Sequence, residues 1–195
     1  MKIGIDIDGV LTDIEQFELD YGSKYYIENT NKRLKNPFGY GSQKIFKGSY
    51  KEDTKFWEKA IYQYIKEPPR KFADEVIKKL KNEGNEIYII TARTSDLSYC
   101  DITKEQMEQI VKIWLKENDI CYDEIIFTKE SKLKYCIDNN ITIMIEDKPK
   151  NVKELSKIMP VICFDARYNQ KCKGKNIIRC YSWYDIYDKI KNLIR

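Results

Sequence analysis

The sequence predicts an α/β fold, in which a doubly wound, mainly parallel sheet carries a small helical insertion after its first strand. Short apolar runs typical of buried strands alternate with amphipathic helical patterns along most of the 195 residues, as in sheets of this class. A segment from residue 14 to 69 interrupts the alternation and is rich in aromatic residues. The length suits one α/β core with an inserted element, because two domains of average size would need a longer chain.

The first strand is predicted from Lys2 to Ile7, and two acids, Asp6 and Asp8, lie at its end, followed by Gly9. Gly9 gives the backbone the freedom to turn sharply. Ligands of open parallel sheets bind at the carboxyl ends of the strands, so two acids there are better placed for chemistry than for packing. If the extended geometry continues through Asp8, both side chains project to the same side. Two such charges in one site need a cation or a shared proton.

The segment 14–69 contains twelve aromatic residues, almost half of those in the chain. Apolar residues recur every fourth position in two places: Phe17, Tyr21 and Tyr25, and Phe56, Ala60 and Tyr64. This spacing predicts two or more helices around an irregular middle at residues 36–41. We expect most of these aromatic side chains to pack a small core of the segment itself, and two or three to face a functional site.

The core resumes after Pro68-Pro69 with a helix from residue 71 to 83, whose apolar positions Phe72, Val76, Ile77 and Leu80 are expected to face inward. Gly84 stands where a helix C-cap is expected. The remaining predicted elements are strands at 85–92, 122–128, 141–145, 160–166 and 176–181, and helices at 104–118, 131–139 and 184–194.

The residues from Asp6 to Thr12, Asp-Ile-Asp-Gly-Val-Leu-Thr, closely resemble the first motif of the haloacid dehalogenase-like (HAD) phosphatases. Calcium loops also use Asp at alternate positions, but the further acids and the glycine that an EF-hand loop requires are out of place here. The family places a small helical cap after its first strand. The resemblance therefore implies a Rossmann-like core of residues 1–13 and 70–195 and a cap of residues 14–69.

Two further strand ends are similar to the second and third motifs of this family. The strand at 85–92 reaches Thr91, followed by Ala92 and Arg93; the resemblance implies that the Thr91 hydroxyl and the adjoining backbone amides hold the phosphoryl oxygens. The third motif is a lysine at the start of a helix, which matches Lys132 after a predicted Ser131 cap. The helix dipole does not favour a cation there. Lys129 and Lys134 remain alternatives.

The fourth resemblance is the acidic pair Glu146-Asp147 after the strand at 141–145. In the family such a pair completes a Mg²⁺ site, with the second acid as a direct ligand. Many members have Asp at the first position, so Glu146 is expected to act either directly or through water. The implied metal ligands are the carboxylates of Asp6 and Asp147 and the backbone carbonyl of Asp8.

The resemblance also implies the chemistry. Asp6 would attack phosphorus to form an aspartyl-phosphate, and Asp8 would protonate the leaving oxygen and then activate water. Thr91 and Lys132 would stabilise charge on the transferred group. Dehalogenases lack the second acid and the P-type ATPases of the superfamily have Thr there, so Asp8 favours a phosphatase or phosphomutase.

The composition excludes several classes of protein. There are 35 basic and 31 acidic residues, a net charge of +4, which argues against dedicated nucleic-acid binding because that function usually brings a strong basic excess. The chain has no histidine, so catalysis by Ser-His-Asp or Cys-His groups and histidine phosphoryl transfer are ruled out. The six cysteines form no Cys-x-x-Cys pair and are expected to be free thiols.

No charge-free apolar run approaches the ~20 residues that span a bilayer, and no secretory signal precedes the first strand, so we expect a cytoplasmic protein without a membrane partner. The sequence leaves a homodimer open. The early cap, Thr91-Ala-Arg93 and the end of the fourth motif are most similar to the 5′(3′)-deoxyribonucleotidase-like branch. The resemblance thus implies a Mg²⁺-dependent nucleotidase acting on nucleoside monophosphates. Alternatives are a sugar-phosphate phosphatase, a nucleic-acid-end phosphatase, and a non-catalytic module that binds phosphorylated ligands.

Overall fold

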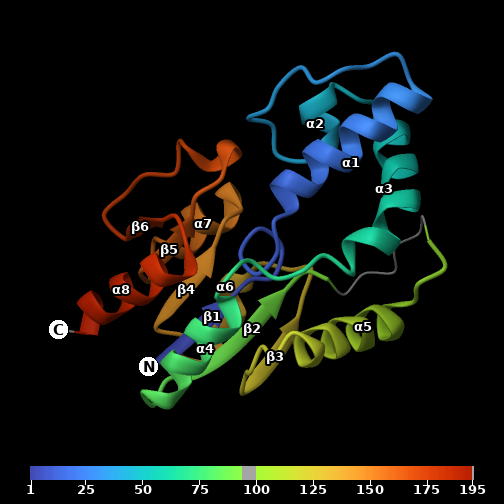
Figure 1. Cartoon of the computed structure of the whole chain (residues 1–195). Coiled ribbons are helices and arrows are strands. Elements are labelled where there is room, and N and C mark those ends of the chain that lie inside the picture. Colours follow the sequence, from blue (N-terminus) through green and yellow to red (C-terminus); the bar gives the residue numbers. More distant parts are fainter. Residues whose placement is uncertain (94–99, 195) are drawn as a thin grey trace.

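The chain folds around a six-stranded parallel sheet in the order β3-β2-β1-β4-β5-β6 (Figure 1). The computed structural model describes residues 1–93 and 100–194. The strands are β1 (Lys2–Ile5), β2 (Glu86–Thr91), β3 (Glu124–Phe127), β4 (Ile143–Glu146), β5 (Val161–Phe164) and β6 (Ile177–Cys180). Strands are added first on one side of β1 and then on the other, which confirms the doubly wound sheet. The direction of winding reverses between β1 and β4, where ligands of such sheets bind.

Helices cover both faces of the sheet. One face packs against α4 (Ala73–Asn82), α5 (Lys104–Glu117) and α8 (Trp183–Ile194), and the other against α6 (Lys132–Asp138) and α7 (Pro149–Leu155). Strand alternation divides the apolar side chains between the two faces, so that Ile87 and Ile89 belong to the first core and Tyr88 and Ile90 to the second. The helical patterns of the sequence are therefore confirmed, with shifts of one or two residues at their ends.

Three helices lie between β1 and α4 and stand apart from the sheet beyond the carboxyl ends of its strands (Figure 1). They are α1 (Ile14–Asn29), α2 (Ser42–Phe46) and α3 (Tyr50–Tyr64). Tyr26 of α1 stacks on Phe46 of α2 at 4.6 Å, and both rings are fully buried. Gly22 lets these helices approach, because a Cβ at this position would lie 2.6 Å from the Phe46 ring. Six of the twelve aromatic side chains are buried in a small core of the insertion, Trp57 packs against it, and the other five are exposed.

The first strand is shorter than predicted. It ends at Ile5, and the Ile7 carbonyl accepts hydrogen bonds from the amides of Val10, Leu11 and Thr12 at 3.3, 2.9 and 3.0 Å. Gly9 adopts φ +86° within this turn, which a side chain would resist. The extended geometry therefore does not continue through Asp8, and the expectation that both aspartates project as alternate residues of one strand is wrong.

Phe72 is a second correction. The helix begins at Ala73 rather than at residue 71, and Phe72 is its N-cap with φ 67°. Its side chain is 55% exposed and packs edge-on against the Tyr184 ring at 5.6 Å. The inward positions Val76, Ile77 and Leu80 are fully buried, as predicted.

The structure also describes the state of the cysteines and the character of the helices. All six cysteines are free, and four of them are buried. Within residues 1–93 and 100–194, none of the helices has the length and apolar character needed to cross a bilayer.

Candidate active site

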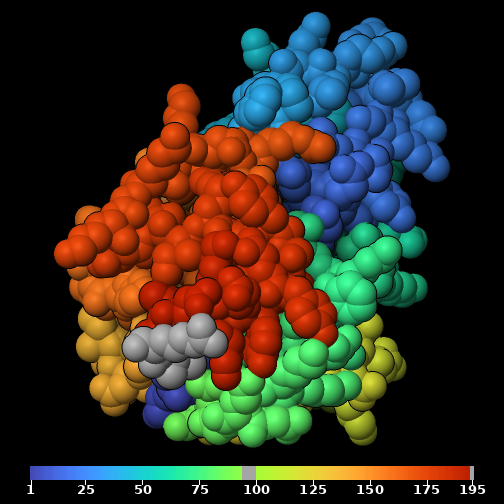
Figure 2. Space-filling model, turned by 60° about the vertical axis from the view of Figure 1, so that its left-hand side comes forward, coloured from blue at the N-terminus to red at the C-terminus, as the bar shows by residue number. Residues whose placement is uncertain are grey.

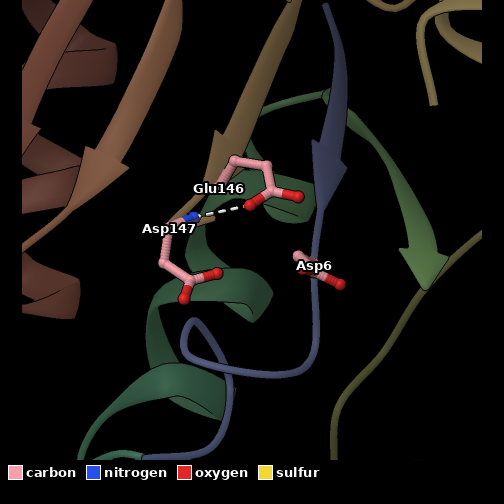
Figure 3. A group of neighbouring side chains, drawn as sticks. All are labelled: Asp6, Glu146 and Asp147. Atoms are coloured by element: carbon pink, nitrogen blue, oxygen red, sulfur yellow. Dashed lines mark hydrogen bonds between the residues drawn. The ribbon is translucent and has the colours of Figure 1, made fainter. Parts of the chain in front are cut away.

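Three acids meet where the winding of the sheet reverses. Ile5 of β1 pairs with Ile145 of β4, and the Asp6 amide donates to the Ile145 carbonyl at 3.1 Å. Asp6, which follows β1, and Glu146, the last residue of β4, therefore lie side by side, with Asp147 next in the chain. One carboxylate oxygen from each of Asp6, Glu146 and Asp147 lies within 4.8 Å of the other two (Figure 3). Such a group of oxygen ligands suits a hard divalent cation.

Lys132 supplies a positive charge to this carboxylate group. Its buried ammonium lies 2.8 Å from Oδ1 of Asp6 and 2.9 Å from Oε1 of Glu146. Lys132 is the first residue of α6, after the Ser131 cap whose hydroxyl accepts from the Leu133 amide. The two carboxylates explain a cation at this end of a helix, which the dipole alone would disfavour. The other two candidate lysines, at positions 129 and 134, have exposed side chains.

Burial dominates the electrostatics of the carboxylate group. It raises the pKa of Asp6 to about 7, against the opposing effect of Lys132, and Glu146 adds to the rise. Burial also raises the pKa of Asp147 well above its usual range, with Glu146 and Asp6 adding to the effect. For Lys132, burial is outweighed by Asp6 and Glu146, which together raise its pKa. In the described part of the chain, three buried carboxyls thus share one ammonium, and a further cation would allow all three to ionise.

Glu146 is fully buried and its oxygens are already bonded. Besides Lys132, they accept from the amides of Asp147 at 2.7 Å and Lys148 at 2.8 Å and from Nδ2 of Asn151 at 2.5 Å. Burial favours the neutral acid, but these donors and Lys132 outweigh it and lower its pKa. This arrangement fits an indirect role for Glu146, in which it orients the neighbouring groups.

Asp147 has one oxygen bonded and one unpartnered. Oδ2 accepts from the Tyr168 hydroxyl, whereas Oδ1 is buried without a hydrogen-bond partner. An unpartnered buried carboxylate oxygen is costly, and a metal ion would satisfy it. Gly9 makes room for this side chain, because a Cβ there would lie 2.1 Å from Oδ2. The residues present therefore fit a bound Mg²⁺.

Asp8 has a separate set of partners. Its Oδ1 accepts from Nε of Arg93 at 2.6 Å and from the Tyr64 hydroxyl at 2.5 Å. The Tyr64 hydroxyl also lies 2.9 Å from Oγ1 of Thr12, to which Arg93 donates at 3.2 Å. Burial opposes the charge of Arg93, but Asp8 and Tyr64 outweigh it and raise the pKa of the guanidinium. Asp8 is thus held as an ion pair, beside a tyrosine from the end of α3.

The end of β2 carries the residues predicted to hold a phosphoryl group. Thr91 is fully buried and its Oγ1 accepts from the Arg93 amide at 3.2 Å, while Ala92 is exposed. The guanidinium of Arg93 binds Asp8, as described above. Binding of phosphate by Thr91, Ala92 and Arg93 therefore stays a prediction. The Thr91 hydroxyl oxygen accepts from the Arg93 amide, so its proton would be free to bond a phosphoryl oxygen.

The structure adds three residues that the sequence did not single out. Thr12 and Tyr64 lie beside Asp8, and Tyr168 binds Asp147. In the sequence, Tyr64 stands out only by the helical spacing that it shares with Phe56 and Ala60. Tyr168 could have been sought, because it follows a strand whose carboxyl end lies at the same edge of the sheet as those of β1 and β4. A second aromatic residue of the insertion, Tyr40, packs edge-on against Tyr168 at 5.1 Å.

Comparison with known proteins gives one family and several relatives. Residues 1–194 match the family described as 5′ nucleotidase, deoxy (pyrimidine), cytosolic type C protein (NT5C). A nucleotidase of Clostridium acetobutylicum is 32% identical over 196 residues, which cover 99% of this chain and 95% of that protein. A Chlorobaculum tepidum protein with the provisional name 5′(3′)-deoxyribonucleotidase is 28% identical over 98% of this chain and 91% of its own length.

Solved structures share the fold at lower identity. A crystal structure from Clostridium acetobutylicum, described as a predicted phosphatase, superposes with a TM-score of 0.62 at 14% identity and covers 98% of each chain. A HAD-superfamily hydrolase of Ehrlichia chaffeensis gives 0.55 at 15% identity, covering 100% of this chain and 97% of that one. These likenesses support the α/β fold.

Proposed function

Because the chain belongs to the cytosolic 5′-nucleotidase (NT5C) family of the haloacid dehalogenase-like superfamily and is thus a phosphomonoester hydrolase, we propose that it is a Mg²⁺-dependent nucleotidase acting through an aspartyl-phosphate on Asp6. The observation that carries this proposal is the buried group at the reversal of the sheet, in which Asp6 lies beside Lys132 and Asp147 has an unpartnered oxygen. Asp8 stands apart from that group with its own partners, which supports a different role for the second acid.

The size of the rate enhancement requires several groups. Hydrolysis of phosphate monoesters is among the slowest uncatalysed reactions and calls for accelerations of up to roughly 10²¹-fold, whereas one acid/base group contributes about 10²- to 10⁴-fold. Covalent catalysis divides the reaction into two easier steps. The Asp6 contacts with Lys132 and with the Ile7 amide both use Oδ1, which leaves Oδ2 to attack phosphorus.

The other residues would act around this nucleophile. Lys132 and Thr91 would donate to the phosphoryl oxygens and stabilise their charge. Asp8 would protonate the leaving oxygen in the first step and take a proton from water in the second. Mg²⁺ would be held by the carboxylates of Asp6 and Asp147 and the carbonyl of Asp8, with Glu146 orienting its neighbours. When bound, it would reduce the repulsion between the carboxylate and the phosphate.

We further propose that residues 14–69 act as a cap that selects a nucleoside monophosphate. Tyr40 of the cap is exposed and packs against Tyr168, which binds Asp147, so the cap offers an aromatic face near the site. Stacking is worth about 1–3 kcal/mol per base in proteins that bind single strands. If all of this stacking free energy is gained in the transition state, kcat/KM would favour a substrate with a base over one without by roughly 5- to 150-fold.

A substrate panel tests this proposal. Purified protein with Mg²⁺ is given nucleoside 5′- and 3′-monophosphates, their deoxy forms, sugar phosphates, a 5′-phosphorylated oligonucleotide and an aryl phosphate, and released phosphate is measured. Nucleotides should exceed sugar phosphates of equal charge in kcat/KM. Equal turnover of sugar phosphates would reject the nucleotide assignment, and preference for the oligonucleotide would favour an end phosphatase. No turnover of any ester, including the aryl phosphate, would favour a module that only binds phosphorylated ligands.

A further inference from the structure

Tyr168 lies in a short 3-10 helix, η1 (Arg167–Asn169), that follows β5. Its hydroxyl donates to Oδ2 of Asp147, while Oδ1 of the same carboxylate is buried without a partner. We propose that Tyr168 is a positioning residue, which holds the Asp147 carboxylate by Oδ2 and so presents Oδ1 to a divalent cation. This inference rests on the metal site of the proposed function, but it concerns a residue that takes no part in the reaction itself.

A carboxylate in this place needs a partner for the oxygen that does not bind metal. Asp147 is 1% exposed, so water cannot satisfy either oxygen from bulk solvent, and Gly9 lies against Oδ2 without offering a side chain. The Tyr168 hydroxyl is the hydrogen-bond donor to this carboxylate among the described residues. Without it, Oδ2 would compete with Oδ1 for the cation or remain buried and unbonded.

The turn that carries Tyr168 is itself anchored to the backbone of Asp147. The side-chain amide of Asn169 is fully buried and donates to the carbonyls of Asp147 at 2.9 Å and Phe164 at 2.8 Å. Arg179 of β6 in turn donates to Oδ1 and to the carbonyl of Asn169, at 2.8 and 2.9 Å. The backbone carbonyl and the side-chain carboxylate of Asp147 are therefore both bonded to η1. This short turn thus fixes the direction of the carboxylate relative to the main chain.

The cap supports the same turn from the other side. The Tyr40 ring packs at 5.1 Å and 88° against the Tyr168 ring, and the Arg167 amide donates to Oε1 of Glu15 in α1 at 2.5 Å. Figure 2 shows the orange-red segment after β5 against the blue start of the insertion. The phenol is thus enclosed between the core and the cap, which restricts the directions in which its hydroxyl can point.

The test compares three Tyr→Phe variants, each of which keeps its ring. Mn²⁺ binding is measured by electron paramagnetic resonance, and Mg²⁺ binding by calorimetry, both without substrate. Loss of the hydrogen bond to a metal-binding carboxylate typically weakens metal affinity about 10- to 100-fold, and we expect this for Tyr168→Phe. Tyr181→Phe, at a side chain 68% exposed, should match the wild type. Tyr64→Phe, whose hydroxyl contacts Asp8, should bind Mn²⁺ as the wild type does.

Steady-state kinetics provide a second measurement. For Tyr168→Phe, the Mg²⁺ concentration for half-maximal rate should rise by the same factor, while kcat at saturating Mg²⁺ stays within about 3-fold of the wild type because the reacting groups are retained. Mn²⁺ affinity within 2-fold of the wild type would overturn the positioning role while leaving the nucleotidase proposal standing. Weaker Mn²⁺ binding in a protein that hydrolyses no ester would support the role of Tyr168 and reject the nucleotidase. A wild type that binds neither cation would overturn both.

Discussion

The two aspartates that follow β1 lie in different surroundings, although one residue separates them. Asp6 is almost completely buried and contacts Lys132, beside Glu146 and Asp147, so its partners all come from the core. Asp8 is partly exposed and its partners are Arg93 from the end of β2 and Tyr64 from the end of α3 in the cap. The turn that closes on the Ile7 carbonyl, between the two aspartates, accounts for this separation.

The difference indicates how the proposed catalytic roles are divided between Asp6 and Asp8. Asp6 and Glu146 are held by Lys132 and by the core backbone, so they can keep their geometry whether or not the cap moves, which suits the nucleophile. Asp147 is held by Tyr168, against which the cap residue Tyr40 packs, so the cap also supports this metal ligand. The Asp8 side includes a residue from the cap, so any displacement of α3 alters the surroundings of the proposed acid/base. Substitutions on the Asp6 side should therefore abolish the chemistry, and those on the Asp8 side should change its dependence on the leaving group.

The largest effect is expected for Asp6→Asn. The amide is a poor nucleophile and removes one charged metal ligand, so turnover and phosphoenzyme should both fall below detection. Rapid quench with ³²P-labelled substrate and mass spectrometry of the quenched protein measure these. Asp20→Asn, at an exposed position of α1, is the matched control and should keep full activity. A phosphoenzyme in Asp6→Asn would show that another residue is the nucleophile.

Asp8→Asn should give the next largest effect. Its proposed metal contact is a backbone carbonyl, which remains, whereas the proton transfers, worth about 10²- to 10⁴-fold each, are lost. An aryl phosphate needs no proton on its leaving group, so its first step should be partly rescued and phosphoenzyme should accumulate on Asp6. The Arg93 side chain is 8% exposed and would lose its partner, so folding must be verified by thermal unfolding.

The leaving-group comparison decides the outcome for Asp8. If a folded Asp8→Asn protein loses activity on a nucleotide and on an aryl phosphate to the same degree, and traps no phosphoenzyme, Asp8 is not the acid/base. Retained activity on both substrates would contradict the division of roles in the same way.

Tyr64→Phe should have a smaller effect of the same kind. The variant keeps the ring that lies 4.6 Å from the Arg93 guanidinium but loses the hydroxyl bonded to Asp8 and Thr12. Hydrogen bonds to charged groups contribute about 1.5–3 kcal/mol, so a loss of roughly 10- to 150-fold in kcat on nucleotides is expected, with a smaller loss on an aryl phosphate. An equal loss on both substrates would indicate that Tyr64 does not act through Asp8.

Much of the core could be predicted from the sequence, because its signals are local. The apolar run before Asp6, the helical stripe from Val76 to Leu80 and the Ser131 cap each depend on residues close together in the chain, and the structure contains all three. The strand ends that carry Asp6, Thr91 and Glu146 then meet because parallel strands share one carboxyl edge.

The contacts that cross between distant segments could not be predicted. The Tyr64 hydroxyl reaches Asp8 across 56 positions, and Tyr168 reaches Asp147 across 21, and no spacing rule links such residues. The end of β1 differs from the prediction for a local reason, because the amides of Val10, Leu11 and Thr12 bind the Ile7 carbonyl and the chain turns before the apolar run and its acids are complete. Side-chain direction in the cap depends on how its helices pack.

Glu18 of α1 provides a contrast with the carboxylates of the core. It is 5% exposed, and burial raises its pKa to about 8, with Asp53 adding to the rise. The core carboxylates lie beside the buried ammonium of Lys132. Glu18, with its pKa raised to about 8, is expected to be neutral at pH 7. Its folded pKa lies above the usual value, so the wild-type protein should lose stability as pH rises from about 4.5 to about 8.

Glu18→Gln should remove this pH dependence with the smallest effect on activity, because the glutamine stays neutral throughout and lies outside the site. Relative to the wild type, the variant should gain up to ~1.4 kcal/mol in free energy of unfolding per pH unit over this range, and the gain should level off above pH 8. Urea unfolding between pH 5 and 9 measures it. Glu28→Gln, at an exposed position of the same helix, should show a difference that does not vary with pH. A Glu18→Gln protein whose advantage is constant, or shrinks as pH rises, would mean that Glu18 is ionised in the folded cap and that the cap, like the core, holds a buried negative charge.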